Sequence, residues 1–423
     1  MVQYKFTGDK GDEYVKKATR WPYFLAAIVN GFFLGVLFIW TYFRDELGNL
    51  FPTWKASDLS LIFSLHNVFI CISVILAGSL LKKFSNRTIL FIAGLALLIG
   101  FGLFPFLPLD RPDLAFIMAA ILFGVIGASS IGIASTAGYA LYTQWAPEHP
   151  GKVVGAMSLA LSIAPIILGA VCSQIVPALG ALQTIRWVGI AVAALLFLTL
   201  PLAKPPGPDV QLPPARVRVE NPNQKEIAPK EMVRMPSFWL LLLFNTVIRA
   251  SGLMIIDFGG SIAILFGLTA ILGMLYSPAN GIANIIGGIL IDKYDTTKVI
   301  FLCGGTLLLG AILLLAGNAQ DNGFLVMAGL LIGGLSYGCG TVQSTASIRI
   351  LYGQKHYAQN FGYLQISILI AALSGYMAGR LLDRDSGNYQ GVFIMIFICA
   401  LAVIVCGFGM AAHIKLQKRK GAD

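Results

Sequence analysis

The chain has 423 residues, of which 57% are hydrophobic and only 12% are charged, and its formal net charge is +10. Soluble domains carry about 25% charged residues, so the composition excludes a soluble enzyme or binding module and indicates an integral membrane protein. In such a protein a positive net charge reflects membrane topology, and we expect no nucleic-acid partner.

The first twenty residues are polar and charged and lack the apolar core and cleavage site of a signal peptide. We expect them to form a cytoplasmic segment, 1–20, and the first apolar run to serve as its own insertion signal. The cysteines all fall inside apolar runs without close pairs. This pattern predicts neither a disulfide framework nor a metal site.

Apolar runs of about 20 residues, the length that crosses a bilayer as a helix, recur along the chain. We predict an all-α integral membrane protein with twelve transmembrane helices in two six-helix pseudo-repeats. The predicted spans are 21–43, 59–81, 88–108, 114–143, 153–176, 185–203, 237–260, 268–291, 298–317, 324–347, 358–380 and 390–412. The boundary between the seventh and eighth is marked only by glycine and serine.

The basic residues predict the orientation. With both termini in the cytoplasm, 23 of the 30 Lys and Arg residues fall in inside segments and six, Arg44 among them, fall outside, as the positive-inside rule requires. The proline-rich, charged stretch 204–235 then reads as a cytoplasmic linker. It separates an N-terminal six-helix lobe, 21–203, from a C-terminal six-helix lobe, 236–413, which is followed by a cytoplasmic tail, 414–423.

Two short motifs repeat between the lobes. Arg20, Pro22 and Phe24 precede span one as Arg234, Pro236 and Phe238 precede span seven, and a glycine-leucine-lysine pattern follows spans two and eight. Their offsets are 214 and 210 residues, which favours an internal repeat of the kind found in two-lobed transporters.

Arg249 lies near the middle of the seventh span. An arginine at that depth costs roughly 2.5–3.5 kcal/mol on insertion scales, so it is expected to face a cavity, a partner or a substrate. Asn245 lies four residues earlier and shares its helix face, and the two side chains together suit a carboxylate. A structural pair of Arg249 with Asp257 is the alternative, although about 12 Å along the helix separates them.

Asn280 and Asn284 are also four residues apart, on a glycine-rich helix. They are predicted either to hold polar groups of a substrate or to link helices without one. Tyr139, Gln343 and Gln365 are weaker substrate-binding candidates on spans four, ten and eleven. Asp257 and His66 are candidates for proton coupling, His66 because histidine titrates near pH 6.5; an interfacial carboxylate and a packed core histidine are the alternatives.

Residues 288–298, GILIDKYDTTK, and their twin 78–87, GSLLKKFSNR, resemble the cytoplasmic loop signature of the major facilitator superfamily. Asp292, Lys293 and Lys298, with Lys82, Lys83 and Arg87 in the first copy, are therefore expected to act in gating by forming ion pairs that break during switching. Simple topological anchoring is the alternative. Lys82 stands where the family has an aspartate.

Three stretches resemble the oxalate/formate antiporter and monocarboxylate transporter group within that superfamily: MPSFW at 235–239, WAPEHPGKVVG at 145–155, and the residues from Tyr352 to Lys355 and from Asn360 to Gly362. The resemblance implies transport of small carboxylates by proton symport or by exchange. Three charged positions of that group are neutral here, where Asn284, Asn280 and Ile368 stand. Arg249 is then the only buried cation expected at the midplane.

We therefore expect a monomeric secondary active transporter of a small organic anion, a monocarboxylate, in a bacterial inner membrane, either coupled to protons or working by exchange. A transporter or exporter of a neutral or zwitterionic metabolite is one alternative, and a non-transporting membrane receptor or scaffold is another. No nucleophile and base pair, phosphate loop or metal cluster is recognisable, so we expect no enzyme activity and no cofactor.

Overall fold

A computed structural model describes residues 20–207, 210, 212–213, 226–353, 355–385 and 387–420. Most of the predicted N-terminal segment, much of the linker and the last three residues of the tail lie outside this part of the chain. Within it, all regular secondary structure is helical, because a helix satisfies its backbone polar groups internally in lipid.

The first half of the chain forms one group of helices, the N-terminal bundle. The η elements are 3-10 helices, except η3, which is a π-helix. The bundle consists of α1 (Trp21–Gly35), η1 (Val36–Ile39), α2 (Trp40–Leu50), α3 (Ala56–Leu80), α4 (Asn86–Gly102), η2 (Phe104–Phe106), α5 (Pro112–Ala119), η3 (Ala120–Gly127), α6 (Ala128–Tyr142), η4 (Thr143–Trp145), α7 (Pro150–Leu179), α8 (Ala181–Thr199) and η5 (Leu200–Leu202).

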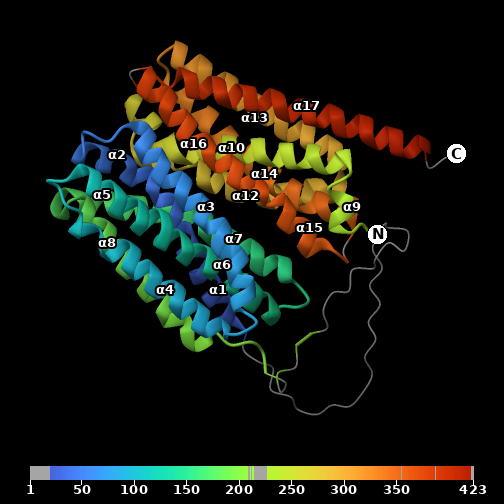
Figure 1. The fold of residues 1–423 in the computed structure, drawn as a ribbon, viewed down its shortest axis with the longest axis horizontal. Helices are drawn as coiled ribbons and strands as arrows, with labels where there is room; N and C mark the ends of the chain where they lie inside the picture. Colours follow the sequence, from blue (N-terminus) through green and yellow to red (C-terminus); the bar gives the residue numbers. More distant parts are fainter. Residues whose placement is uncertain are drawn as a thin grey trace.

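The second half forms the C-terminal bundle, which lies beside the first (Figure 1). It consists of α9 (Pro229–Met232), α10 (Pro236–Leu265), α11 (Ala270–Gly273), α12 (Tyr276–Lys293), α13 (Thr296–Ala319), α14 (Gly323–Tyr352), α15 (Tyr357–Leu364), α16 (Ile366–Arg384) and α17 (Gln390–Lys420). We call the end of the molecule where α1 and α10 begin the linker side, and the opposite end, where α2 and α10 finish, the far side.

The helices provide twelve segments long and apolar enough to cross a membrane, which confirms the predicted number of spans. The repeated proline motif marks two helix starts, since α1 and α10 both carry proline in their first turn. Proline is tolerated there because the N–H groups of the first turn have no hydrogen-bond partner within the helix. The weakly marked turn after α10 contains Gly267 at a φ of 71°, a conformation that glycine adopts without strain.

The first span is longer than its hydropathy predicts. Its helix tightens through η1 and continues as α2 to Leu50, whereas the prediction ended it at residue 43. Arg44 is consequently part of a membrane helix and only 3% exposed. The prediction that it lies in an outside segment is wrong.

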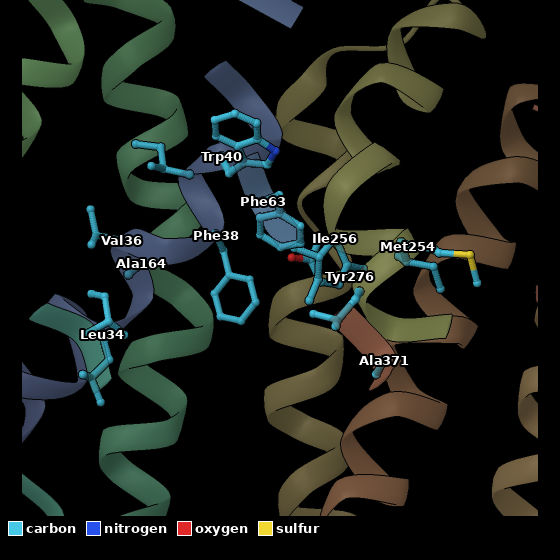
Figure 2. Packing of buried hydrophobic residues seen from close by; sticks show 14 of the residues in the cluster. Leu34, Val36, Phe38, Trp40, Phe63, Ala164, Met254, Ile256, Tyr276 and Ala371 are labelled. Atoms are coloured by element: carbon cyan, nitrogen blue, oxygen red, sulfur yellow. The ribbon is translucent and has the colours of Figure 1, made fainter. Parts of the chain in front are cut away.

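Close contacts join the two bundles toward the far side. A Cβ on Gly260 of α10 would lie 2.6 Å from the Thr41 carbonyl oxygen of α2, and a Cβ on Gly379 of α16 would lie 2.7 Å from the Ser57 Cα of α3. Apolar side chains fill the same boundary. Phe38 packs edge-on against Tyr276 across it, with ring centroids 6.4 Å apart (Figure 2).

A substitution at Gly379 tests the close contact between α3 and α16. We expect Gly379→Ala to lower the melting temperature of the purified protein, because the new methyl group would overlap backbone atoms of α3 at Ala56 and Ser57; overpacking of this kind costs about 1–3 kcal/mol. Gly305→Ala on α13 is the matched control, since nothing lies within 4 Å of its Cβ position. Equal melting temperatures for the two variants would contradict tight contact between α3 and α16.

Candidate functional site

A buried ion pair joins the bundles near the far side. The Nε of Arg44 on α2 lies 3.3 Å from Oδ1 of Asp257 on α10, and the two side chains are 3% and 0% exposed. The indole nitrogen of Trp40 donates to the same carboxylate oxygen at 3.0 Å. Removing one partner of a buried pair leaves an uncompensated charge, so this contact holds α2 against α10.

Arg44 also reaches beyond Asp257 to both bundles. Its terminal nitrogens donate to Ser261 of α10 at 3.3 Å and to Ser60 of α3 at 3.3 Å, and its guanidinium carbon lies 4.1 Å from the centre of the Phe258 ring. Ser261 in turn donates to Asp45 beside Arg44. One guanidinium therefore organises a polar network across the boundary, which we call the Arg44 network.

A second polar contact closes the same end. The carboxylate of Asp383 on α16 accepts the backbone N–H groups of Ala56 at 2.8 Å and Ser57 at 3.2 Å. These are among the free N–H groups at the first turn of α3, where a carboxylate is favoured by the helix dipole. Together with the Arg44 network, this contact closes the far side of the boundary between the bundles.

The alternative prediction, a structural pair of Arg249 with Asp257, is wrong, because Asp257 is paired with Arg44 instead. Arg44 is buried more completely than Arg249, but it lies near the far side, so the expectation that Arg249 is the only buried cation at the midplane stays a prediction. Sequence reasoning missed Arg44 because its neighbours Asp45 and Glu46 lower the local hydropathy and resemble a loop.

Arg249 lies on α10 with neutral partners. Its Nε donates to Oδ1 of Asn245 at 3.3 Å, and a terminal nitrogen donates to Oε1 of Gln365, at the start of α16, at 3.4 Å. Asn245 donates to Ser367 at 2.6 Å. The structure thus brings together three residues singled out from the sequence, Arg249, Asn245 and Gln365.

The charge of Arg249 is not neutralised by protein groups in the part of the chain that the structure describes. Its side chain is half-buried, its hydrogen-bond acceptors are amide oxygens, and none of the described carboxylates forms a salt bridge with it. A guanidinium has five N–H donors, so donors remain for an anion. Arg44, by contrast, is paired with a carboxylate and donates to two serines.

The two asparagines of α12 lie on the side of α14. Asn284 is half-buried and accepts a hydrogen bond from the Thr341 hydroxyl of α14 at 3.2 Å. Asn280 is 6% exposed, and its Oδ1 has no hydrogen-bond partner within the described residues. A buried amide oxygen without a partner is costly, and it offers an acceptor for a ligand hydroxyl or amine.

A cavity of about 470 Å³ opens between the bundles on the linker side. Residues of α14 form most of its wall, and one residue of α7 faces them. The lining residues are Val154, Thr341, Val342, Thr345, Ala346, Arg349 and Tyr357. Of these residues, Thr341 donates a hydrogen bond to Asn284, which itself does not line the cavity.

A second cavity, of about 350 Å³, lies at the linker end of the N-terminal bundle between α1, α6 and α7. Arg20 and Glu148 form an ion pair there. Burial raises the pKa of the Glu148 carboxyl, but hydrogen bonds from Arg20 and the backbone, together with the charges of Arg20 and His149, outweigh burial and hold this pKa below its usual range. Neither cavity is lined by Arg249, Asn245 or Gln365.

Two further predicted site residues, Gln343 and Tyr139, line neither cavity. Gln343 is fully buried, and its amide nitrogen donates to the Thr296 carbonyl of α13 at 3.1 Å and to Ser347 at 2.9 Å. It therefore links α14 to α13 inside the C-terminal bundle. Tyr139 is half-buried on α6, packs against the hydrophobic core and lines neither cavity.

His66 occupies a packed core position. It is 0% exposed, and its ring lies 4.3 Å from that of Phe123. Its Nδ1 lies 2.8 Å from the Phe123 carbonyl oxygen, to which it must donate. Phe123 lies in the π-helix η3, whose altered backbone pairing makes its carbonyl available. These surroundings match the packed core histidine rather than a proton carrier.

The charges of the loop signatures lie on the linker side. Lys82, Lys83, Arg87 and Lys298 are exposed, and none forms a salt bridge within the described residues. Lys293 is exposed beside the ring of Tyr294, with its Nζ 5.6 Å from the ring centre. Asp292 belongs to α12, but its side chain lies outside the described part, so its predicted pairing stays a prediction.

The comparisons with known proteins agree with this architecture. The sequence model of the Major Facilitator Superfamily matches residues 21–281 and 250–420, which is nearly the whole chain. The chain belongs to this superfamily of transporters. It is similar to an uncharacterized MFS-type transporter, YhjX of Escherichia coli K12, with 24% identity over 366 residues that cover 84% of this chain and 86% of YhjX.

Solved structures show the same fold. A partially occluded inward-open structure of the xylose transporter XylE from E. coli superposes with a TM-score of 0.68 at 13% identity, covering 93% of this chain and 99% of XylE. A D-xylose–proton symporter superposes with a TM-score of 0.70 at 13% identity, covering 93% and 97%. This multi-pass membrane protein thus has the twelve-helix fold that the sequence predicted.

Removal of one partner tests the ion pair. We expect Asp257→Asn and Arg44→Gln each to destabilise the protein by about 3–5 kcal/mol, and the double variant to lose less than the sum, because it strands no charge. Thermal unfolding of the four purified proteins measures this coupling. Asp110→Asn is the control, since Asp110 pairs with Arg111 but is 79% exposed.

The same variants should open the far side. Ser64 is 5% exposed and lies beside Asp257 and Gly375, so a Ser64→Cys thiol should react slowly with a membrane-impermeant maleimide. Reaction should be at least several-fold faster when Asp257→Asn is added. Additive destabilisation together with unchanged labelling would mean that the pair does not hold this end closed.

Proposed function

We propose that the protein is a secondary active transporter of a small organic anion, a monocarboxylate, that works by alternating access. Support comes above all from Arg249. It is a membrane-embedded cation whose described partners are the amide oxygens of Asn245 and Gln365, so a carboxylate would supply the missing negative charge. Two N–H donors of a guanidinium match the two oxygens of a carboxylate.

The orientation is part of the proposal. The excess of Lys and Arg on the linker side favours that side as cytoplasmic, with the molecule in a bacterial inner membrane. The far side, closed by the Arg44 network and by Asp383, would then be the external gate. The cavity of about 470 Å³ would open to the cytoplasm, as in an inward-facing state.

Switching would require both ends to rearrange. To open outward, Asp257 must leave Arg44, and a buried carboxylate without its cation is most stable as the neutral acid. We therefore keep Asp257 as the site where a proton could be coupled to transport, with exchange of one anion for another as the second mode. His66, a packed core residue, is left out. Lys82, Lys83, Arg87, Asp292, Lys293 and Lys298 would then meet partners when the cytoplasmic side closes.

A second candidate function is supported by α12. Asn280 and Asn284 are neutral, and Asn280 presents a buried acceptor without a described partner, which suits a hydroxyl or ammonium donor. A neutral or zwitterionic solute is therefore the alternative cargo. Competition between carboxylates, amino acids and sugars for the same uptake would decide between the two.

Arg249 is the residue to change first. In proteoliposomes we expect the wild-type protein to take up at least one radiolabelled member of a panel of formate, acetate, lactate, pyruvate and oxalate. Arg249→Ala should reduce that uptake at least a hundredfold while size-exclusion behaviour and melting temperature are kept. Arg249→Lys should retain part of it, because a lysine keeps the charge but not the paired donors.

Lys230→Ala is the matched control, since Lys230 is an exposed cation on the linker side with no proposed role in gating and should leave uptake within twofold of wild type. Undiminished uptake by Arg249→Ala would remove Arg249 from the site. Binding of a panel member, detected by a thermal shift, without any flux would instead favour a receptor or scaffold.

A further inference from the structure

The second cavity, of about 350 Å³, is built largely from a stretch of sequence to which the proposed transport function gives no role. The residues from Trp145 to Val153 join α6 to the first turn of α7, and they belong to the segment 145–155 that resembles the carboxylate transporter group. The cavity lies between this connection and the start of α1. It is therefore at the end of three membrane helices, where the surface of the bilayer is expected.

Contacts between α1 and this connection hold the cavity in shape. The ring of Tyr23 stacks on that of Trp145, with ring centroids 3.4 Å apart. The Trp145 indole nitrogen donates to the Lys204 carbonyl at 2.9 Å. Arg20 and Glu148, which both line the cavity, form an ion pair. A site whose walls are fixed in this way loses little affinity to rearrangement when it accepts a ligand.

The charges that line the cavity leave one positive charge in excess, with His149 counted as neutral. Arg20 and Glu148 compensate each other, whereas Lys152 is exposed and none of the described carboxylates forms a salt bridge with it. Lys152 lies in the first turn of α7, a helix of 30 residues, where the helix dipole also favours an anion. The cavity therefore suits a ligand with a single negative charge.

Two buried polar atoms of the cavity wall lack a partner within the described residues. Oε2 of Glu148 accepts no hydrogen bond there, although Oε1 is paired with Arg20. The Tyr142 hydroxyl, on a side chain that is 1% exposed, lies near Thr199 but forms no hydrogen bond of acceptable geometry. Unpaired buried groups are costly, so a ligand is favoured that donates to the carboxylate and pairs with the hydroxyl.

An apolar surface continues from the cavity along α1. Trp21 and Phe24 line the cavity, with their rings edge-on and centroids 5.8 Å apart. Trp21 is 72% exposed, and Leu25, one turn further along the same helix face, is 58% exposed. An exposed tryptophan at the end of a membrane helix is typical of the headgroup level of the bilayer. This surface favours a lipid over a free phosphate ion.

We propose that the cavity binds an anionic glycerophospholipid with a hydroxylated headgroup, of which phosphatidylglycerol is the simplest example. The phosphate lies between Lys152 and the first turn of α7, a headgroup hydroxyl donates to Oε2 of Glu148, and an acyl chain follows Trp21 and Leu25. Basic pockets between membrane helices bind anionic lipid headgroups through the same chemistry. The lipid joins α1 to α7 and stabilises the linker end of the N-terminal bundle.

Native mass spectrometry of the purified full-length protein tests the site by titration with lipids that have equal acyl chains. We expect phosphatidylglycerol to bind the wild type at least fivefold more tightly than phosphatidylethanolamine, whose ammonium leaves the excess positive charge uncompensated. Phosphatidylmethanol has the same charge but no headgroup hydroxyl, so it should bind two- to fivefold more weakly than phosphatidylglycerol. Lys152→Ala should reduce the affinity for phosphatidylglycerol at least fivefold, and Lys152→Arg should retain most of it.

Lys230→Ala is the matched control, because Lys230 is an exposed cation on the linker side that lines neither cavity. Its affinity for phosphatidylglycerol should stay within twofold of wild type. Phosphatidylglycerol should also raise the melting temperature of the wild type and of Lys230→Ala, because a ligand that binds only the folded state stabilises it, and it should have little effect on Lys152→Ala.

Equal affinities for phosphatidylglycerol and phosphatidylethanolamine, or equal losses in Lys152→Ala and Lys230→Ala, would overturn the lipid site. Equal binding of phosphatidylmethanol would overturn the headgroup contact with Glu148. Displacement of phosphatidylglycerol by inorganic phosphate at comparable concentration would show that the cavity recognises a free phosphate, and the assignment to a lipid would be wrong. None of these outcomes depends on which solute the protein carries.

Discussion

The contact between Arg44 and Asp257 is the interaction on which the far side of the molecule depends. Both charges lie where water cannot reach them, and they come from different bundles. Each needs the other, because an isolated buried charge is far more costly than a paired one. The ion pair is therefore expected to be either fully formed or fully separated, without stable intermediate distances. When it separates, water or a proton must stabilise the two groups.

The contacts around the ion pair also hold the far side closed. Gly260 and Gly379 let the helices of the two bundles approach to backbone contact, and Asp383 accepts two N–H groups at the start of α3. Opening the far side must break all of these together. On the linker side a cavity separates α7 from α14 instead. This difference between the two ends is what alternating access requires, since one end must close while the other is open.

The two membrane arginines have different roles because their partners differ. Arg44 is held by a carboxylate, serines and an aromatic ring, so its charge is compensated within the protein. Arg249 is oriented by amide oxygens and keeps its charge uncompensated within the described residues. In the proposed function the first arginine controls the external gate and the second attracts the cargo.

Local patterns in the sequence predicted the spans and much of the Arg249 cluster. Twelve apolar runs, proline at two helix starts and the four-residue spacing of Asn245 and Arg249 are short-range features, and the structure contains the predicted helices and brings these side chains together. The pairing of Arg44 with Asp257 could not be predicted from local patterns, because it forms only when the two bundles pack against each other. The sequence left two roles open for His66, because its partner is a carbonyl of a π-helix that hydropathy does not reveal.

Alternating access is tested most directly by distances across both ends of the molecule. Spin labels at the exposed positions Asn49 and Arg384 report the far side, and labels at Lys83 and Lys293 report the linker side, in a background without the native cysteines. Adding a transported carboxylate should give the far-side pair a longer component and the linker-side pair a shorter one in pulsed electron double resonance. Two unchanged distributions under conditions where the carboxylate binds would contradict the account.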